Sequence, residues 1–479
     1  MRARQSPQAG KERMSGGFST LADTAPHTPE PARPHQRFAY AVSAVAAVSG
    51  LLFGFDIAVI NGAIVFLRDQ FHLSSLETEF AASSLLFGCI AGAGIAGWLS
   101  DRYGRRRVLA LAALLFAASS IGAALPRTFI EFGIARFVGG IAIGVASMLA
   151  PLYIAEVSPA RIRGRLVSFN QMAIVTGILI AYLINWALSF LGSSGWRWMF
   201  AVAVVPSLGF FLGLLFVPES PRWLVEQERD DDALAVLSRV EGPGVAPGLL
   251  RDIRESVLRE AGSFRDLLAP ALRRPMFLTV ALAILSQITG INTVLFYGSV
   301  IWEQQLGGHS YSHAIGANVT IGLMNFLATI VALWLIDRNG RRPLLMFSSG
   351  CMALCQLLLG IAFLLQPPPA VLVLSCMLLC VAAFAVGLGP ATWVLMAELF
   401  PTRVRGRAMS VANMALWIAC FALTATFLSL AQAITITGAF CVYSAMCVLT
   451  FLLVWRMAPE TKGRTLEEIE TSWLSGRAQ

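Results

Sequence analysis

The motif DRYGRRR, at residues 101–107, reveals how the chain is organised because a similar motif recurs in its second half. It returns as DRNGRRP at residues 337–343, an offset of 236 residues counted from 101 to 337. A second motif, AEVSPARIRGR at 155–165, returns as AELFPTRVRGR at 397–407, an offset of 242 residues counted from 155 to 397. Two motifs that recur in the same order at nearly the same offset indicate an internal duplication. The chain is therefore predicted to consist of two similar halves.

The composition is that of a membrane protein. The 479-residue chain is 56% hydrophobic and 13% charged, with a mean hydropathy of +0.68, whereas about a quarter of the residues of a soluble protein are charged. Lipid favours helices of roughly 20 apolar residues, in which every backbone group is paired. We predict an all-α membrane protein of twelve transmembrane helices in two six-helix pseudo-symmetric halves, residues 37–217 and 276–456. The predicted spans lie near residues 38–67, 80–100, 107–125, 130–156, 167–191, 197–217, 276–304, 314–336, 343–365, 370–398, 408–430 and 434–455.

The remaining segments are polar. Residues 218–275 are predicted to be a cytoplasmic linker with short surface helices, since apolar residues recur at helical spacing from Leu250 to Leu258. Residues 1–36, which lack the apolar region of a signal peptide, are predicted to be a disordered cytoplasmic tail. Residues 457–479 are predicted to be a second cytoplasmic tail.

Arginines gather in four short loops, near residues 101–107, 157–166, 337–342 and 399–407. An excess of Lys and Arg in short loops marks the cytoplasmic side of a membrane. These loops and both termini are therefore predicted to be cytoplasmic. The net charge of +8 follows from this topology, and we do not expect a nucleic acid partner.

The repeated motifs also combine arginines with carboxylates, which predicts a cytoplasmic ion-pair network. Such a network would hold the cytoplasmic ends of the two halves together in one conformation and break in another. The alternative interpretation is that the arginines only set the topology. Glu460, in PETKGRT, is a further candidate. The predicted members are Asp101, Arg105, Arg106, Glu156, Arg165, Glu219, Arg222, Asp337, Arg341, Arg342, Glu398 and Arg407.

Seven motifs, in order along the chain, resemble the sugar porter family of the major facilitator superfamily. PESPRWL and PETKGRTLEEIE are the most specific of them, whereas DRxGRR is shared across the superfamily. The resemblance implies a transporter with alternating access and a monosaccharide or polyol substrate. The motifs are GWLSDRYGRRRVL (97–109), AEVSPARIRGR (155–165), PESPRWL (218–224), GINTVLFY (290–297), DRNGRRPL (337–344), GPATWVLMAELFP (389–401) and PETKGRTLEEIE (459–470).

A sugar site needs amides, which both donate and accept hydrogen bonds, together with an aromatic face. The resemblance implies that matching positions here bind the sugar, while the alternative is that these polar groups only join helices. The predicted substrate-binding residues are Gln171, Ser286, Gln287, Asn292, Asn325, Trp393 and Trp417. The predicted gating or site-lining aromatics are Phe53, Phe296 and Tyr297.

The chain also departs from the family pattern. Ser286 stands where the family usually has Gln, and Ile178 stands where xylose carriers tend to have Gln. Ala385 and Cys420 replace side chains that are polar in many glucose carriers. These departures leave the identity of the sugar open.

Asp56, in FGFDIAVINGA (53–63), is a carboxylate inside an apolar span, and Arg136 is a cation inside another. Because an unpaired charge is costly in lipid, we predict that the two pair. A contact made in only one conformation would couple the proton affinity of Asp56 to transport. In the resembled family, proton symporters carry Asp at this position. The alternative is a static pair that fixes helix packing.

These observations predict a secondary active transporter that imports a hexose or pentose by proton symport, through alternating access. The main alternative is a proton-independent facilitative sugar or polyol carrier, and a drug or organic-acid carrier is another. The chain lacks a P-loop, and His309 and His313 have metal-like spacing without a third ligand. We therefore expect no enzyme activity, cofactor or metal. The resemblance implies a monomer in a bacterial inner membrane.

Overall fold

The computed structural model describes residues 34–259, 267, 269–305, 311–365, 367–400 and 402–462. Within these ranges the side chains of 34–36, 258, 259, 271, 303–305, 337, 402 and 403 are not described. The predicted tail at 1–36 and the part of the second tail from 463 onward fall largely outside the described residues, and so does His309.

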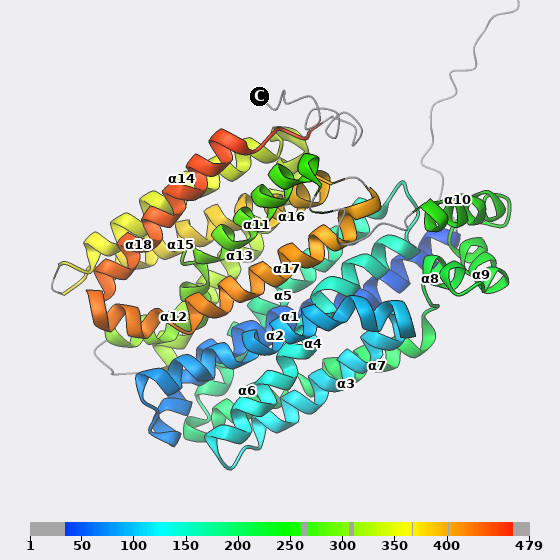
Figure 1. The fold of residues 1–479 in the computed structure, drawn as a ribbon. Coiled ribbons are helices and arrows are strands. Elements are labelled where there is room, and N and C mark those ends of the chain that lie inside the picture. Colours follow the sequence, from blue (N-terminus) through cyan, green and yellow to red (C-terminus); the bar gives the residue numbers. More distant parts are fainter. Residues whose placement is uncertain are drawn as a thin grey trace, which may run out of the picture.

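Within the described residues, twelve helical segments are long and apolar enough to cross a membrane, in agreement with the predicted number of spans. Six of them form the first half, drawn in blue to cyan in Figure 1. The sixth span of this half is built from three consecutive short helices. The elements are α1 (Pro34–Phe71), α2 (Ser75–Tyr103), α3 (Arg105–Ala124), α4 (Phe129–Val157), α5 (Arg163–Ser189), η1 (Gly192–Ser194), α6 (Gly195–Ala201) and α7 (Val204–Phe216).

The second half also has six spans, but two of them are broken in the middle. The seventh span breaks at Gly290, whose φ of +84° lies in the left-handed region that favours glycine. A Cβ at Gly290 would lie 2.6 Å from the Tyr443 ring, so the close approach also requires glycine. The tenth span breaks at Gly387. The elements are α11 (Arg273–Ile288), α12 (Ile291–Gln305), α13 (Tyr311–Asn339), α14 (Arg341–Ala362), α15 (Ala370–Val386), α16 (Leu388–Glu398), α17 (Thr402–Thr424) and α18 (Phe427–Met457).

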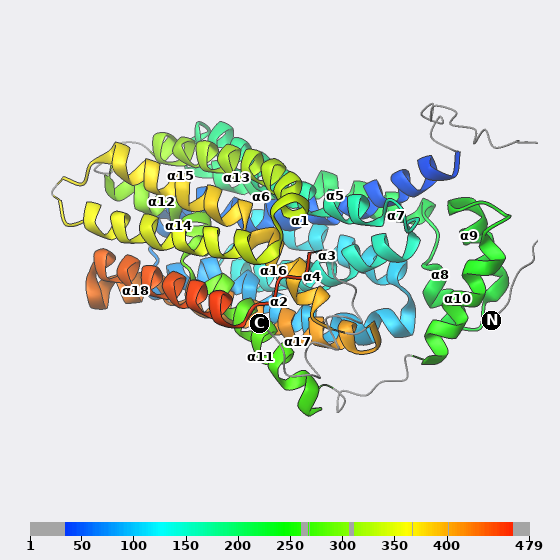
Figure 2. The same ribbon diagram turned by 90° about the horizontal axis from the view of Figure 1, so that it is seen from above.

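The segment between the halves contains three short helices, α8 (Pro221–Glu226), α9 (Asp230–Val240) and α10 (Ala246–Arg259). A short 3-10 helix, η3 (Pro270–Leu272), leads into α11. In both Figure 1 and Figure 2, α8–α10 lie beyond one end of the helices of the first half. We call this end, which carries the repeated arginine motifs, the Arg-rich end, and the opposite end the Arg-poor end.

In the described part of the chain the two halves meet mainly along three pairs of helices, α1 with α12, α2 with α17, and α5 with α13, and α2 also contacts α18. Polar contacts between the halves gather at the Arg-poor end. There the Asn61 amide of α1 donates to the carbonyl oxygen of Leu295 on α12 at 2.7 Å, and Asn61 Oδ1 accepts from the backbone N–H of Ser299 at 3.0 Å. Tyr182 on α5 donates to the same Leu295 oxygen at 3.1 Å. The halves are therefore joined at the Arg-poor end in this structure.

Candidate functional site

Asp56 on α1 and Arg136 on α4 form a buried ion pair within the first half. Arg136 Nη1 lies 3.2 Å from Asp56 Oδ1, and Arg136 Nη2 donates to the Asp56 backbone oxygen at 2.9 Å. The Arg136 guanidinium also lies over the Phe200 ring, 5.3 Å from its centroid. The Arg136 side chain is 0% exposed and the Asp56 side chain is 5% exposed. Both members of the pair are therefore buried, and Asp56 is slightly more exposed than Arg136.

This geometry makes the ion pair sensitive to a proton on one partner only. Protonation of the Asp56 carboxyl would remove the charge that offsets Arg136, while the bond from Arg136 to the Asp56 backbone oxygen does not depend on that charge. Breaking a buried ion pair on one side leaves an uncompensated charge, which is strongly unfavourable. Arg136 Nε already lacks a hydrogen-bond partner. Protonation of Asp56 would therefore leave the Arg136 charge without an offsetting partner.

An amide pair crosses the break in the seventh span. Asn292, the second residue of α12, donates from Nδ2 to Gln287 Oε1 near the end of α11, at 2.9 Å. Gln287 Nε2 in turn donates to Ser286 Oγ at 3.2 Å. Asn292 is 7% exposed and Gln287 is half-buried. The break at Gly290 thus brings three of the predicted substrate-binding residues into one hydrogen-bonded chain.

Two predicted aromatic residues meet between the halves. Phe53 on α1 and Trp417 on α17 pack with ring centroids 5.7 Å apart. Trp417 is 3% exposed, and its Nε1–H has no hydrogen-bond partner. A buried donor without a partner is costly, and a ligand hydroxyl can satisfy it. Trp417 therefore offers both a flat apolar face and an unused donor.

The other predicted aromatics are packed in the second half. Phe296 and Tyr297 are both 0% exposed. The Tyr297 hydroxyl donates to the Thr424 carbonyl oxygen at 2.7 Å, and its ring lies 5.2 Å from that of Phe427. In this conformation both side chains belong to the core.

The three remaining predicted substrate residues come from three different helices. Gln171 on α5 is half-buried, Asn325 on α13 is 7% exposed, and Trp393 on α16 is 36% exposed. Among the described residues, no hydrogen bond joins these side chains to the amide pair. A cavity of about 260 Å³ lies elsewhere, at the Arg-poor end, and contains none of the predicted residues.

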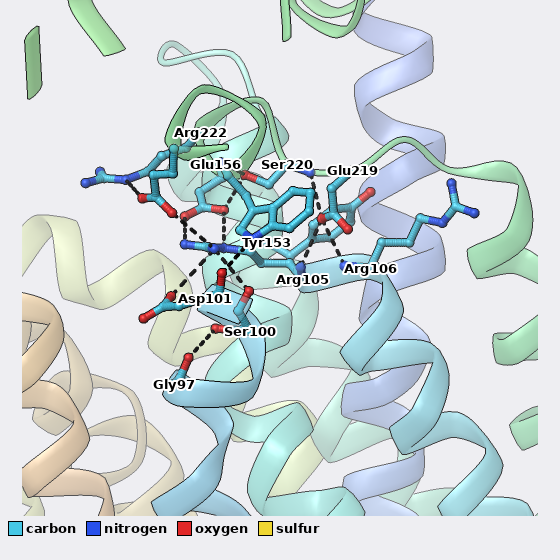
Figure 3. Close-up of polar contacts among 12 residues, drawn as sticks. Gly97, Ser100, Asp101, Arg105, Arg106, Tyr153, Glu156, Glu219, Ser220 and Arg222 are labelled. Carbon is cyan, nitrogen blue, oxygen red and sulfur yellow. Dashed lines mark hydrogen bonds and ion pairs between the residues drawn. The ribbon is translucent and has the colours of Figure 1, made fainter. Parts of the chain in front are cut away.

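The arginine motif of the first half forms a compact ionic cluster at the Arg-rich end (Figure 3). Arg105, at the start of α3, lies 3.2 Å from Glu156, 3.5 Å from Glu226 and 3.6 Å from Asp101. Glu219 accepts hydrogen bonds from the backbone N–H groups of Arg105 and Arg106, both at 3.0 Å. These N–H groups have no partner inside the helix, so the carboxylate caps α3.

The described residues of the second half repeat this arrangement. Arg341, at the start of α14, lies 3.0 Å from Glu398. Glu460 accepts from the backbone N–H groups of Arg341 and Arg342, both at 3.1 Å. Thr461 donates to Glu398 at 2.6 Å, as Ser220 donates to Glu156 in the first half. The motifs PES and PET thus have the same structural role in the two halves.

Among the described residues, Arg105 binds carboxylates of the first half and of α8, and Arg341 binds Glu398 of the second half. Of the other predicted members, Arg222 lies 3.5 Å from Glu226, Arg165 is exposed, and Arg407 is half-buried on α17. The side chain of Asp337 lies outside the described residues. In this conformation Arg105 stabilises the end of the first half and Arg341 that of the second.

Sequence reasoning missed several polar residues that the structure brings together. Glu226 and Ser220 join the Arg105 cluster. The sequence did contain a signal for Ser220, because Ser220 and Thr461 occupy the same position after the glutamate in the motifs PES and PET. Asn61 and Glu79 bind the opposite half at the Arg-poor end. Asn61 lies five residues after Asp56, within the stretch that already drew attention to α1.

Comparisons with known proteins agree with this architecture. The sequence profile of the family described as "Sugar (and other) transporter" matches residues 42–473. The arabinose-proton symporter of Bacillus subtilis (strain 168) is 37% identical over 463 residues, covering 95% of this chain and 99% of the relative. The D-xylose-proton symporter of Escherichia coli (strain K12) is 37% identical over 476 residues, covering 91% and 96%.

A solved structure gives the same result. The proton:xylose symporter XylE bound to 6-bromo-6-deoxy-D-glucose, a major facilitator protein, superposes with a TM-score of 0.79 at 36% identity. The match covers 92% of this chain and 100% of that one. The chain therefore belongs to the sugar transporter family and has the twelve-helix fold of the major facilitator superfamily.

Proposed function

We propose that this protein imports a monosaccharide together with a proton by alternating access. The observation that carries the proposal is the buried Asp56–Arg136 pair, which sets an ionisable carboxylate against a cation inside the first half. The relatives named above, which are symporters of arabinose and xylose with protons, support it. The galactose-proton symporter of Escherichia coli is a further relative, at 36% identity.

In the proposed cycle the residues of the two halves have different tasks. Asp56 takes up a proton and loosens Arg136, while the sugar binds the Gln287–Asn292 amides and the donor of Trp417. The halves then rock about the bound sugar, so that the contacts of Asn61 and Tyr182 with α12 form on one side. Sugar and proton leave from the Arg-rich end, and the empty carrier returns.

The orientation and the substrate are part of the proposal. We propose that the Arg-rich end and both termini face the cytoplasm of a bacterial cell, which the arginine bias supports, and that the chain acts as a monomer in the inner membrane. The substrate is a hexose or pentose, because amides and an indole recognise hydroxyls and a sugar ring. Gln171, Asn325 and Trp393 are proposed to complete this site in another conformation.

Uptake into proteoliposomes tests the proposal. One charge moved across 100 mV corresponds to about 2.3 kcal/mol, so one proton can concentrate sugar up to about fiftyfold. Asp56→Asn should reduce the ratio of internal to external sugar to about one while sugar exchange between the two sides continues. Glu131→Gln is the control, since Glu131 is an exposed carboxylate at the start of α4. Equal accumulation with and without a proton gradient in the unmodified protein would refute symport.

A proton-independent sugar carrier is the second candidate. It is favoured by the bond from Arg136 to the Asp56 backbone oxygen and by the Phe200 ring over the guanidinium, which hold Arg136 without the Asp56 charge. In that case Asp56→Asn would transport like the unmodified protein, and its sugar uptake would not depend on pH.

A further inference from the structure

Glu79 is a buried carboxylate that the cycle described above does not use. It lies in the first turns of α2, at the Arg-poor end, and is 1% exposed. Its two carboxylate oxygens both bind Ser429 of α18 in the opposite half. Oε1 accepts from the Ser429 backbone N–H at 2.7 Å, and Oε2 accepts from the Ser429 hydroxyl at 2.6 Å.

The backbone N–H of Ser429 belongs to the first turn of α18. Thr426 is the N-cap of this helix, and the N–H groups of a first turn have no partner inside it. A carboxylate at this place satisfies such a donor and is favoured by the helix dipole. Glu79 of the first half thus caps a helix of the second half. This cap is a charge-assisted contact that exists only while the two halves touch.

The start of α18 is attached to α2 rather than being continuous with the rest of its own helix. α18 is kinked at Ile434 and Thr435, and Thr435 has a φ of +68°, which a residue other than glycine rarely adopts. Before the kink, Gln432 also donates to Ser75 of α2, at 2.6 Å. After the kink, Ser444 donates to Ala353 of α14, within the second half. The kink therefore separates a segment bound to the first half from the rest of α18.

We propose that Glu79 is a positioning residue for the transport cycle, a latch that holds the Arg-poor end closed by capping α18 across the interface. This inference rests on the alternating access of the proposed function. When the Arg-poor end opens, Glu79 must release Ser429 and form hydrogen bonds with water instead. The strength of the latch thus sets the ratio of the two end states, independently of sugar and of Asp56.

Hydrogen–deuterium exchange of the sugar-free protein in nanodiscs tests the latch. In Glu79→Ala, exchange should rise about tenfold in α12 at the Arg-poor end, which corresponds to about 1.4 kcal/mol. At the same time exchange should fall at the Arg-rich ends of α4 and α17, because alternating access closes that end. Ser429→Ala keeps the backbone donor. It should therefore raise exchange at the Arg-poor end and lower it at the Arg-rich end, as Glu79→Ala does, but by a smaller factor.

The control is Glu77→Gln. Glu77 lies two residues from Glu79 on the same helix, but it is exposed, and among the described residues its side chain binds Ser74 of its own half and nothing else. It should leave exchange at α12 and at the Arg-rich end unchanged. If Glu79→Ala raised exchange at both ends, the residue would only stabilise the fold, and the latch would be refuted. Unchanged exchange at both ends would refute it equally. Neither outcome bears on sugar uptake or proton coupling, which the proteoliposome assay tests.

Discussion

Asp56 and Asn292 lie in the first transmembrane span of their respective halves, yet they have opposite kinds of partner. Asp56 binds Arg136 of another helix, and both side chains of this pair are charged. Asn292 binds Gln287 across a break in its own span, and both side chains of that pair are neutral. The strength of the first pair depends on whether Asp56 carries a proton, whereas the strength of the second pair does not depend on protonation.

We infer from this difference that the two halves have separate tasks. The charged pair suits the first half to respond to protons, because neutralising one member unbalances the other. The amide pair suits the second half to bind hydroxyls at any physiological pH, because amides do not titrate there. The following substitutions test whether coupling and recognition are separate in this way.

The largest effect is expected for Arg136→Gln. It leaves the Asp56 carboxylate buried without its cation, which should lower the free energy of unfolding by about 3–5 kcal/mol. Accumulation of sugar should also be lost. In the double variant Asp56→Asn/Arg136→Gln no charge remains buried, so most of the stability should return while accumulation stays absent. Thermal unfolding in detergent and uptake into proteoliposomes measure the two effects.

The double variant is also the control for this prediction. If Arg136→Gln were as stable as the unmodified protein, the buried Asp56 carboxylate would not need the Arg136 cation to stabilise it. If the double variant still accumulated sugar against a gradient, the pair would have no part in coupling.

A smaller effect is expected for Gln287→Ala in the second half. Losing a hydrogen-bonded amide at a hydroxyl site costs about 1–3 kcal/mol of binding, which is about a tenfold to hundredfold rise in KM. The ratio of accumulated sugar at saturation should not change, because Asp56 and Arg136 are intact. Gln227→Ala, at an exposed glutamine after α8, is the matched control. A loss of accumulation in Gln287→Ala would contradict the division of tasks.

The spans and the duplication could be predicted from the sequence because lipid imposes length and apolarity on each helix. The Asp56–Arg136 contact also followed from the sequence, since two charges in an apolar medium have few alternatives to each other. The break at Gly290 was not predicted, and the seventh span was expected to be continuous from 276 to 304. A single glycine in an apolar helix does not reveal that its φ will be positive.

The contacts between the halves could not be predicted for a different reason. Asn61 and Glu79 bind the opposite half only in a conformation that is closed at the Arg-poor end. The sequence is the same in every conformation, so it does not indicate which contacts are present in one of them. The ion-pair network was expected to join the halves, whereas Arg105 and Arg341 bind carboxylates of their own halves here. One structure thus shows one set of partners for residues that change partners during a cycle.

The smallest effect is expected for Trp417→Phe, and it should change binding and stability in opposite directions. Phenylalanine keeps a ring against Phe53 but removes the buried Nε1–H, which has no partner in the sugar-free protein. KM should therefore rise about twofold to tenfold, the equivalent of one hydrogen bond, while the melting temperature should stay equal or rise. Trp302→Phe is the matched control, because Trp302 on α12 is also buried with an unpartnered Nε1–H and is not among the predicted substrate residues. Its melting temperature should respond as that of Trp417→Phe does, and its KM should not change. A KM that rose equally in both variants would show that loss of packing, rather than loss of a donor to the sugar, weakens binding.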